Sequence, residues 1–170
     1  MKPVRWIAVL ALGTLVAGCF ALGSRSLPDP VDRALHHRSA RTVTLYSLEP
    51  RSTSGIAKPE AKTFHGHTIL GETAIDDAAT KKKLFAAFRK GVADHDGSVA
   101  ACFLPHHGLR IESDRGTLDL VICFQCAQVK AYENGVPSEA LLISTSPAAA
   151  FDEVLEAAGV PLAKSATPTP

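Results

Sequence analysis

The chain lacks the short motifs of several common enzyme classes. It contains no GxSxG nucleophile elbow, no GxxxxGK[ST] phosphate-binding loop, no GxGxxG dinucleotide-binding pattern and no HExxH zinc motif. Each of these motifs places a nucleophile, a backbone cradle for anions or a pair of metal ligands, so the sequence gives no support for those chemistries. No catalytic residue is predicted, and a non-enzymatic role is the leading hypothesis.

The chain also lacks an excess of either charge. Its 18 basic and 17 acidic residues give a formal net charge of +1. Residues 42–163 hold 11 basic and 15 acidic residues, so this part is mildly acidic. Such a domain has no electrostatic footprint for nucleic acid, which is not an expected partner. Residues 20–41 carry four Arg and two Asp, a surplus that attracts an anionic membrane surface only slightly.

An apolar run long enough to span a bilayer, about 20 residues, is missing too. The run at residues 6–16 has eleven residues and follows the basic Lys2 and Arg5. The small residues Ala17 and Gly18 come next. A basic start, a short apolar core and small residues before a cleavage point are typical of a secretory signal peptide. Residues 1–18 are therefore predicted to be removed on export.

Residues 15–19, LVAGC, resemble the lipobox of bacterial lipoproteins. The resemblance implies that Cys19 is lipidated and becomes the first mature residue. Several acyl chains would hold the protein on its membrane, because each buried methylene contributes about 0.8 kcal/mol and two lipid signals give stable anchoring. Phe20 after the cysteine fits transfer to the outer membrane, facing the periplasm, in a Gram-negative cell. The alternative is an ordinary secretory signal with an incidental cysteine.

Proline and polar residues divide the mature chain into three parts. Residues 19–41 include Pro28 and Pro30 and show no apolar periodicity, so they are predicted to be the lipidated cysteine and a flexible tether. Residues 42–163 are predicted to form a single domain. Residues 164–170 are predicted to be a disordered tail.

Alternating apolar residues bounded by turn signals predict about five strands within the domain. They are expected at residues 42–48, 64–70, 99–112, 117–133 and 138–145. One helix is predicted after the second strand and another after the fifth, in the order β-β-α-β-β-β-α. This order indicates an α+β fold, with a mostly antiparallel sheet and both helices packed on one of its faces.

The first helix is expected to begin at Asp76 or Asp77, whose carboxylates suit an N-cap, and to end at Gly91 or Gly97. An apolar stripe with a spacing of four residues faces the core, and Lys81, Lys82 and Lys83 are expected on the solvated face. The stripe consists of Leu84, Phe88 and Val92. In the last helix, Ser146 is the expected N-cap, Pro147 the first helical residue and Gly159 the C-terminal stop.

Asn134-Gly135 is the strongest turn signal, because a type I′ turn needs positive φ at both positions. Across this turn, residues whose numbers sum to 269 should pair, which places Lys130 opposite Glu139 as an exposed ion pair. The remaining acidic side chains near strands and turns are expected to be caps or solvated groups. They include Asp94, Asp96, Asp114 and Asp119.

Cys102, Cys123 and Cys126 remain after lipidation of Cys19, an odd number in an oxidising compartment. With a hairpin centred near Arg115, opposed residues sum to about 230. Cys123 then faces His107, and Cys102 lies diagonal to Cys126 on one sheet face. A bridge between these diagonal neighbours requires a bulge, for which Pro105 is a plausible cause. A shift of one residue would instead put Cys102 on the Cys123 face.

Strand alternation points Cys123 and Cys126 to opposite faces unless a bulge intervenes, unlike a redox CxxC at a helix N-terminus. A second interpretation of the cysteines is a zinc site. Cys102, His106 or His107, Cys123 and Cys126 would make a Cys₃His set suited to tetrahedral Zn²⁺. A weaker histidine pair is His65 and His67, expected on one face of a strand. Buried free thiols are the third alternative.

Residues 101–108, ACFLPHHG, and 119–126, DLVICFQC, together resemble a family of small uncharacterised bacterial exported proteins and lipoproteins. In that family a CFxPxHG-like strand precedes a DxxxCFxC-like strand, and a C-terminal helix ends in AGVPL, here residues 158–162. His106 stands where a basic residue such as Arg is usual. The resemblance covers roughly residues 42–162 and implies the fold, without an established activity.

The sequence therefore predicts a membrane-anchored envelope lipoprotein with a non-enzymatic binding or structural domain, and no cofactor is expected. Its membrane contact is the lipid anchor, and its protein or small-molecule partner is unidentified. The alternative is a metal- or thiol-dependent site built on Cys102, His106, His107, Cys123 and Cys126, with zinc as the expected metal.

Overall fold

A computed structural model describes residues 26–36, 39–50 and 61–164. Residues 1–18, Cys19 and most of the predicted tail lie outside these described residues. The elements are α1 (Asp29–Ala34), β1 (Thr42–Leu48), β2 (Thr63–Phe64), β3 (His67–Ala74), α2 (Ala78–Asp94), β4 (His107–Ser113), β5 (Gly116–Cys123), β6 (Gln128–Glu133), β7 (Val136–Leu142) and α3 (Ala148–Ala157).

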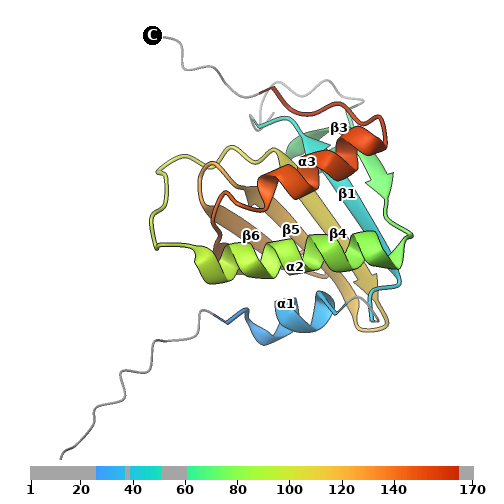
Figure 1. Cartoon of the computed structure of the whole chain (residues 1–170), viewed down its shortest axis with the longest axis horizontal. Helices are drawn as coiled ribbons and strands as arrows, with labels where there is room; N and C mark the ends of the chain where they lie inside the picture. Colours follow the sequence, from blue (N-terminus) through green and yellow to red (C-terminus); the bar gives the residue numbers. More distant parts are fainter. Residues whose placement is uncertain (1–25, 37–38, 51–60, 165–170) are drawn as a thin grey trace, which may run out of the picture.

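The strands form one sheet in the order β2-β3-β1-β4-β5-β6-β7, and each neighbouring pair is antiparallel. Helices α2 and α3 cross one face of this sheet, and α1 lies beside α2 (Figure 1). The predicted α+β class with a mostly antiparallel sheet is confirmed. The described chain has seven strands and three helices, more than the predicted five and two.

The two additional strands arise because two segments that were each predicted as a single strand form hairpins of two strands. Residues 64–70 contain the β2–β3 turn, where His65 and Gly66 have φ of 48° and 84°. Residues 117–133 are split into β5 and β6 by a turn in which Ala127 has φ of 56°. Alanine is uncommon at positive φ, so the residue types gave no signal for the β5–β6 turn, and a single glycine, Gly66, marked the β2–β3 turn. Residues 99–106, predicted as strand, precede β4 as irregular chain.

Helix α1 lies within the segment predicted as a flexible tether. Val31 and Leu35, four residues apart, are buried on the main core, so this segment is part of the folded domain. Pro30 is tolerated because it occupies the first turn of the helix. The Arg89 side chain of α2 attaches α1 to the domain: its guanidinium donates to the Leu35 carbonyl at 3.2 Å and to the Asp32 carboxylate at 3.1 Å.

Helix α2 begins as predicted, with Asp77 as N-cap accepting the Thr80 N–H at 2.7 Å. It ends at Asp94 and runs through Gly91, which was predicted as a stop. Lys81 was expected on the solvated face but is only 8% exposed. Its ammonium donates to the Arg41 carbonyl at 3.3 Å, so its apolar stem is buried while its charged end is satisfied.

Helix α3 begins one residue later than predicted, with Pro147 in place of Ser146 as N-cap. The left-handed Gly159, with φ of 69°, follows the helix as expected. Phe151 and Leu155 face the sheet and are fully buried. The helix therefore closes the same apolar layer as α2.

The β6–β7 turn has the predicted positive φ at both central residues, Asn134 at 50° and Gly135 at 80°. Tyr132 pairs with Pro137 and fits the predicted sum, but a bulge then shifts the register by one residue, so Lys130 pairs with Ala140. The predicted Lys130–Glu139 pair is therefore wrong. The Lys130 ammonium instead lies 4.2 Å from the centroid of the Phe103 ring, a cation–π contact.

Apolar residues gather on both faces of the sheet. The main core lies between the sheet and the helices and includes the fully buried Phe85, Phe88 and Phe151. A smaller core on the opposite face is made by Tyr46, Leu48, Phe64 and Val121. No helix among the described residues is long and apolar enough to cross a membrane.

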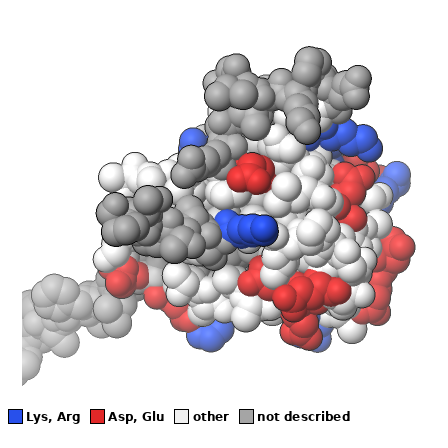
Figure 2. All heavy atoms as spheres, turned by 90° about the horizontal axis from the view of Figure 1, so that it is seen from above, with Lys and Arg blue, Asp and Glu red and all other residues white. Residues whose placement is uncertain are grey.

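Acidic side chains gather along one edge of the face drawn in Figure 2, and basic side chains are scattered over it. This distribution matches the mildly acidic composition of residues 42–163.

Candidate functional site

The register of the β4–β5 hairpin decides which cysteines and histidines meet. Ser113 pairs with Gly116, so the turn contains two residues, and opposed residues sum to 229 instead of 230. His107 therefore faces Ile122, and the predicted pairing of His107 with Cys123 is wrong. The error is one residue because the sequence analysis centred the turn on Arg115 instead of between Asp114 and Arg115.

A disulfide joins Cys123 and Cys126, with the two Cα atoms 5.1 Å apart. Cys123 is the last residue of β5, and the chain then turns toward β6. The side chains of Cys123 and Cys126 were predicted on opposite faces because one strand was expected to continue through both residues. The chain instead turns after Cys123, and this turn lets the two sulfur atoms meet. The expected Cys102–Cys126 bridge is not the one present. Both bridged cysteines are buried, at 1% and 2% exposure.

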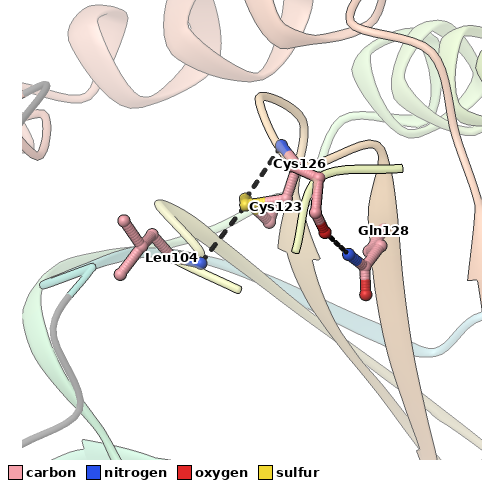
Figure 3. The surroundings of a disulfide bond; sticks show 5 residues. Leu104, Cys123, Cys126 and Gln128 are labelled. Carbon is pink, nitrogen blue, oxygen red and sulfur yellow. Dashed lines mark hydrogen bonds between the residues drawn. A yellow bond between two sulfur atoms is a disulfide. The ribbon is translucent and has the colours of Figure 1, made fainter. Parts of the chain in front are cut away.

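Cys102 is exposed and has a free thiol, yet its loop lies against the disulfide. Ala100 donates its N–H to the Cys126 carbonyl at 3.1 Å, and Leu104 donates its N–H to Cys126 Sγ at 3.3 Å. The Gln128 side chain donates to the Ala100 carbonyl at 2.7 Å. Figure 3 shows the Leu104 N–H directed at the disulfide. The structure thus brings the segment that carries Cys102 to the corner of the sheet that holds the Cys123–Cys126 disulfide.

His107 lies at the start of β4 on the helix-covered face, and only 5% of it is exposed. Its Nε2 is 2.8 Å from Asp152 Oδ1 of α3. Its cross-strand partner is Ser47, and the adjacent Leu48–His106 pair is hydrogen bonded at 2.9 Å. Ser47 and His107 are therefore a non-hydrogen-bonded pair, in which side chains approach most closely.

Among the described residues, neither the buried Ser47 Oγ nor the buried His107 Nδ1 has a hydrogen-bond partner. Unpaired buried polar atoms cost free energy and often mark sites where a ligand or water is held. His107 was predicted from the sequence as a candidate site residue, whereas Ser47 and Asp152 were not. Only the pairing of β1 with β4 and the packing of α3 bring these two residues to it.

A cavity of about 170 Å³ opens beside His107. Its polar groups come from His106, His107, Gln125 and Asp152, and its apolar groups include Leu104 and Phe124. Burial, and next the charge of His107, lower the pKa of His106, while Asp152 and Glu49 act in the opposite direction. His106 is therefore neutral at pH 7, and the cavity offers imidazole nitrogens beside a carboxylate to one small polar group.

A second cluster lies on the opposite face of the sheet, around Asp119 of β5. This carboxylate is 1% exposed, although it was predicted to be solvated. Arg110 of β4 donates to both of its oxygens, at 2.8 and 2.7 Å, and His65 Nε2 lies 2.7 Å from Oδ2. The hydrogen bonds to Asp119 raise the pKa of Arg110 above its usual range.

The β2–β3 turn explains why Asp119 is buried. Phe64 stacks on Tyr46 of β1 with ring centroids 4.6 Å apart, and His65 stacks on Tyr132 of β6 at 3.7 Å. The turn therefore folds over the face of the sheet as far as β6, which is not a neighbour of β2 or β3. Gly108 of β4 permits this approach, because a Cβ there would lie 2.7 Å from the Phe64 ring.

His65 and His67, which were predicted as a weaker metal pair, lie in separate environments. His65 pairs with Asp119, while His67 is 8% exposed and lies 6.3 Å from Phe103 by ring centroids. Among the residues that the structure describes, no group of three or more His, Cys, Asp or Glu side chains is arranged to hold a metal ion.

The pKa of His67 is lowered, first by burial and also by the charges of Lys130 and His65, against a hydrogen bond to the Glu49 backbone that raises it. The unfolded state, with a histidine pKa of about 6.5, thus binds a proton at higher pH than the folded state. The free energy of unfolding is expected to fall as pH decreases below about 6.5. Urea unfolding at several pH values measures this slope.

In His67→Gln the slope should become shallower, with the remainder coming from other groups such as His106. The matched control is His36→Gln, because it removes an exposed imidazole, so the difference between the two variants isolates the contribution of the buried His67. A slope that is the same in His67→Gln and in the unmodified protein would contradict this assignment.

Comparison of the chain with protein-family models, with curated proteins and with solved structures gave no match. The resemblance to small exported bacterial proteins and lipoproteins therefore stays a prediction from the two motifs. The function is argued from the sequence and the geometry of the chain itself.

Proposed function

We propose that the protein is an exported bacterial envelope protein, anchored by lipid on Cys19, whose α+β domain is a non-enzymatic binding or structural module. The observation that carries the proposal is the basic start and the apolar run at residues 6–16, followed by Ala17, Gly18 and Cys19. The buried Cys123–Cys126 disulfide supports the same compartment, because disulfides persist in oxidising environments outside the cytoplasm.

The length of chain between Cys19 and α1 limits how far the domain can lie from the lipid. Asp29, the first residue of α1, is ten positions after Cys19, so the chain holds α1 within about 35 Å of the anchor. Helix α1 contacts β4, and a tight turn connects the end of β4 to β5. His107 begins β4 and lies six residues, or about 20 Å, from Ser113 at the α1 end.

The corner with His107 and the disulfide offers the clearest place for a ligand. The cavity of about 170 Å³ combines apolar walls with convergent polar groups, the usual composition of a binding site, and is large enough for one side chain or a small polar molecule. Ser47, the hydroxyl nearest to His107 in the sheet register, is fully buried and is out of reach of a substrate. Its burial favours binding over hydrolysis.

Replacing the lipid-accepting cysteine tests the anchor. Cys19→Ala, expressed at full length in a bacterial cell, should lose all labelling by radioactive fatty acid and leave the membrane fraction. Cys102→Ser is the matched control, since it removes an exposed cysteine outside residues 15–19 and should keep both the label and the membrane association. Continued labelling of Cys19→Ala would refute the anchor.

The cysteines favour a second candidate, a thiol-dependent site. Ala100 and Leu104 are both hydrogen bonded to Cys126, so the segment that carries the free Cys102 thiol lies against the disulfide. The zinc alternative has weaker support, because Cys123 and Cys126 are bonded to each other and a metal needs free thiolates.

A further inference from the structure

We propose that the cavity beside His107 binds a primary ammonium group at the end of a short aliphatic chain, as in an alkylamine or a lysine side chain. The proposal rests on the binding role proposed above and names the ligand class of that module. Three features carry it: the carboxylate of Asp152, the imidazoles of His106 and His107, and the apolar wall of the cavity.

The contact between His107 and Asp152 leaves hydrogen-bond acceptors without donors. Asp152 Oδ1 lies 2.8 Å from His107 Nε2. An ionised carboxylate only accepts hydrogen bonds, so Nε2 carries the hydrogen, and Nδ1 of the neutral ring is an acceptor. This buried Nδ1 has no partner among the described residues. Asp152 Oδ2 takes no part in the contact, and 39% of the Asp152 side chain is exposed, so this oxygen is open to a ligand.

Charge complementarity selects a cation. Apart from the histidines, Asp152 is the one ionisable residue among the described residues that line the cavity. Burial is the main cause that lowers the pKa of His106, so this imidazole is neutral at pH 7 and supplies a further acceptor nitrogen. An anion would meet a carboxylate of the same sign. A primary ammonium has three N–H donors and no acceptor, which matches the carboxylate and imidazole acceptors.

The size and the walls of the cavity select the chain that carries the ammonium. The volume is about 170 Å³, and a cavity of about 150 Å³ is large enough for a molecule of the size of benzene. An aliphatic chain of about four carbons with its amine has a similar size. Leu104, Phe124 and Leu162 form apolar walls, against which the methylene groups of such a chain would be buried.

The test uses the full chain, expressed in bacterial cells with isotope-labelled histidine and then purified. n-Butylammonium chloride is added stepwise while the imidazole nitrogen signals are followed by NMR. The signals of His106 and His107 should shift until they saturate, and those of the exposed His36 should not. n-Butanol and butyrate, which lack the positive charge, should bind at least about tenfold more weakly, because charge-assisted hydrogen bonds are the stronger ones.

Asp152→Asn tests the carboxylate. The asparagine oxygen still accepts the hydrogen bond from His107 Nε2, so the fold should be retained while the negative charge is lost. The Kd for butylammonium should rise at least about tenfold. Glu156→Gln is the matched control, because it removes an exposed carboxylate from the same helix outside the cavity lining. Its Kd should change less than about twofold.

Ala163→Phe is a second variant, which narrows the cavity without changing its polar groups. Ala163 lines the cavity and lies outside the helices and strands, so this change should leave the fold intact and weaken the binding of butylammonium. Circular dichroism of each variant separates lost binding from lost folding.

A blocked lysine, Nα-acetyl-lysine methylamide, distinguishes the sources of the ammonium. Binding as tight as that of butylammonium would identify a lysine side chain of a protein or peptide, and binding of butylammonium alone would identify a free small amine. Equal affinities for butylammonium and butanol would overturn the proposal, as would equal weakening in Asp152→Asn and Glu156→Gln. Lipid on Cys19 is measured independently, so a lipidated protein that does not bind butylammonium would refute the ligand class and leave the anchor in place.

Discussion

Asp119→Ala is expected to lower the free energy of unfolding by about 2–3 kcal/mol. Asp119 is 1% exposed and accepts hydrogen bonds from both Arg110 and His65. Removing one partner of a buried ion pair typically costs about 3–5 kcal/mol because the other charge is left uncompensated. The expected value is smaller here because the Arg110 side chain is 38% exposed and regains part of its hydration. Chemical denaturation followed by circular dichroism measures the change.

Asp114→Ala is the matched control, since Asp114 also pairs with an arginine, Arg41, but both side chains are about 70% exposed. A surface pair of this kind contributes at most about 1 kcal/mol. The free energy of unfolding should therefore fall less in Asp114→Ala than in Asp119→Ala. Equal losses in the two variants would show that the cover made by the β2–β3 turn does not bury Asp119 in solution.

Gly91→Ala is expected to destabilise the protein by about 2 kcal/mol, although helix propensity alone predicts a gain of about 1 kcal/mol. Gly91 lies inside α2, and its carbonyl accepts the Ser144 N–H at 2.9 Å. A Cβ at this position would overlap the Pro147 ring and lie 2.9 Å from Ile143 Cγ1. The close packing of α2 against the segment between β7 and α3 therefore requires glycine. Thermal and denaturant unfolding measure whether Gly91→Ala raises or lowers the free energy of unfolding.

Pro147→Ala removes the ring atoms that meet the new methyl group and supplies a double-mutant test. Gly91→Ala combined with Pro147→Ala should be more stable than the sum of the two single changes predicts. A stabilising Gly91→Ala, or strictly additive effects, would contradict the close approach of α2 to this segment.

Local patterns predicted the elements whose signals are contained within a few residues. Alternation predicted β1 over residues 42–48, the carboxylate of Asp77 predicted the start of α2, and Asn134-Gly135 predicted the β6–β7 turn. These features depend on backbone conformation and neighbouring side chains, which the sequence contains directly.

Features that depend on distant packing were not predictable in the same way. Alternation correctly indicates that Asp119 faces away from the helices, but it does not show that His65 and Phe64 cover that face. The β4–β5 register was wrong by one residue because pattern alone did not distinguish a two-residue turn from a three-residue turn. Helix α1 was missed because two prolines masked the spacing of Val31 and Leu35.

Most residues of the candidate site could be predicted from the sequence, but the disulfide pairing and the side-chain contacts between them could not. The sequence pattern indicated Cys102, Cys123 and Cys126, but the bridge was predicted between Cys102 and Cys126, whereas it joins Cys123 and Cys126. The sequence pattern did not show the turn after Cys123. This turn decides whether Cys126 comes close enough to Cys123 to form a disulfide. His107 was selected as well, whereas Asp152 reaches it from a helix 45 residues away in sequence.

The central claim is export with a lipid on Cys19, and the mass of the mature protein tests it most directly. The full-length gene product is extracted from bacterial membranes and its intact mass and N-terminal peptide are measured. The account predicts a chain that lacks residues 1–18 and begins at Cys19, with acyl chains on that residue. A chain that retains residues 1–18, or a processed chain whose Cys19 carries no lipid, would contradict it.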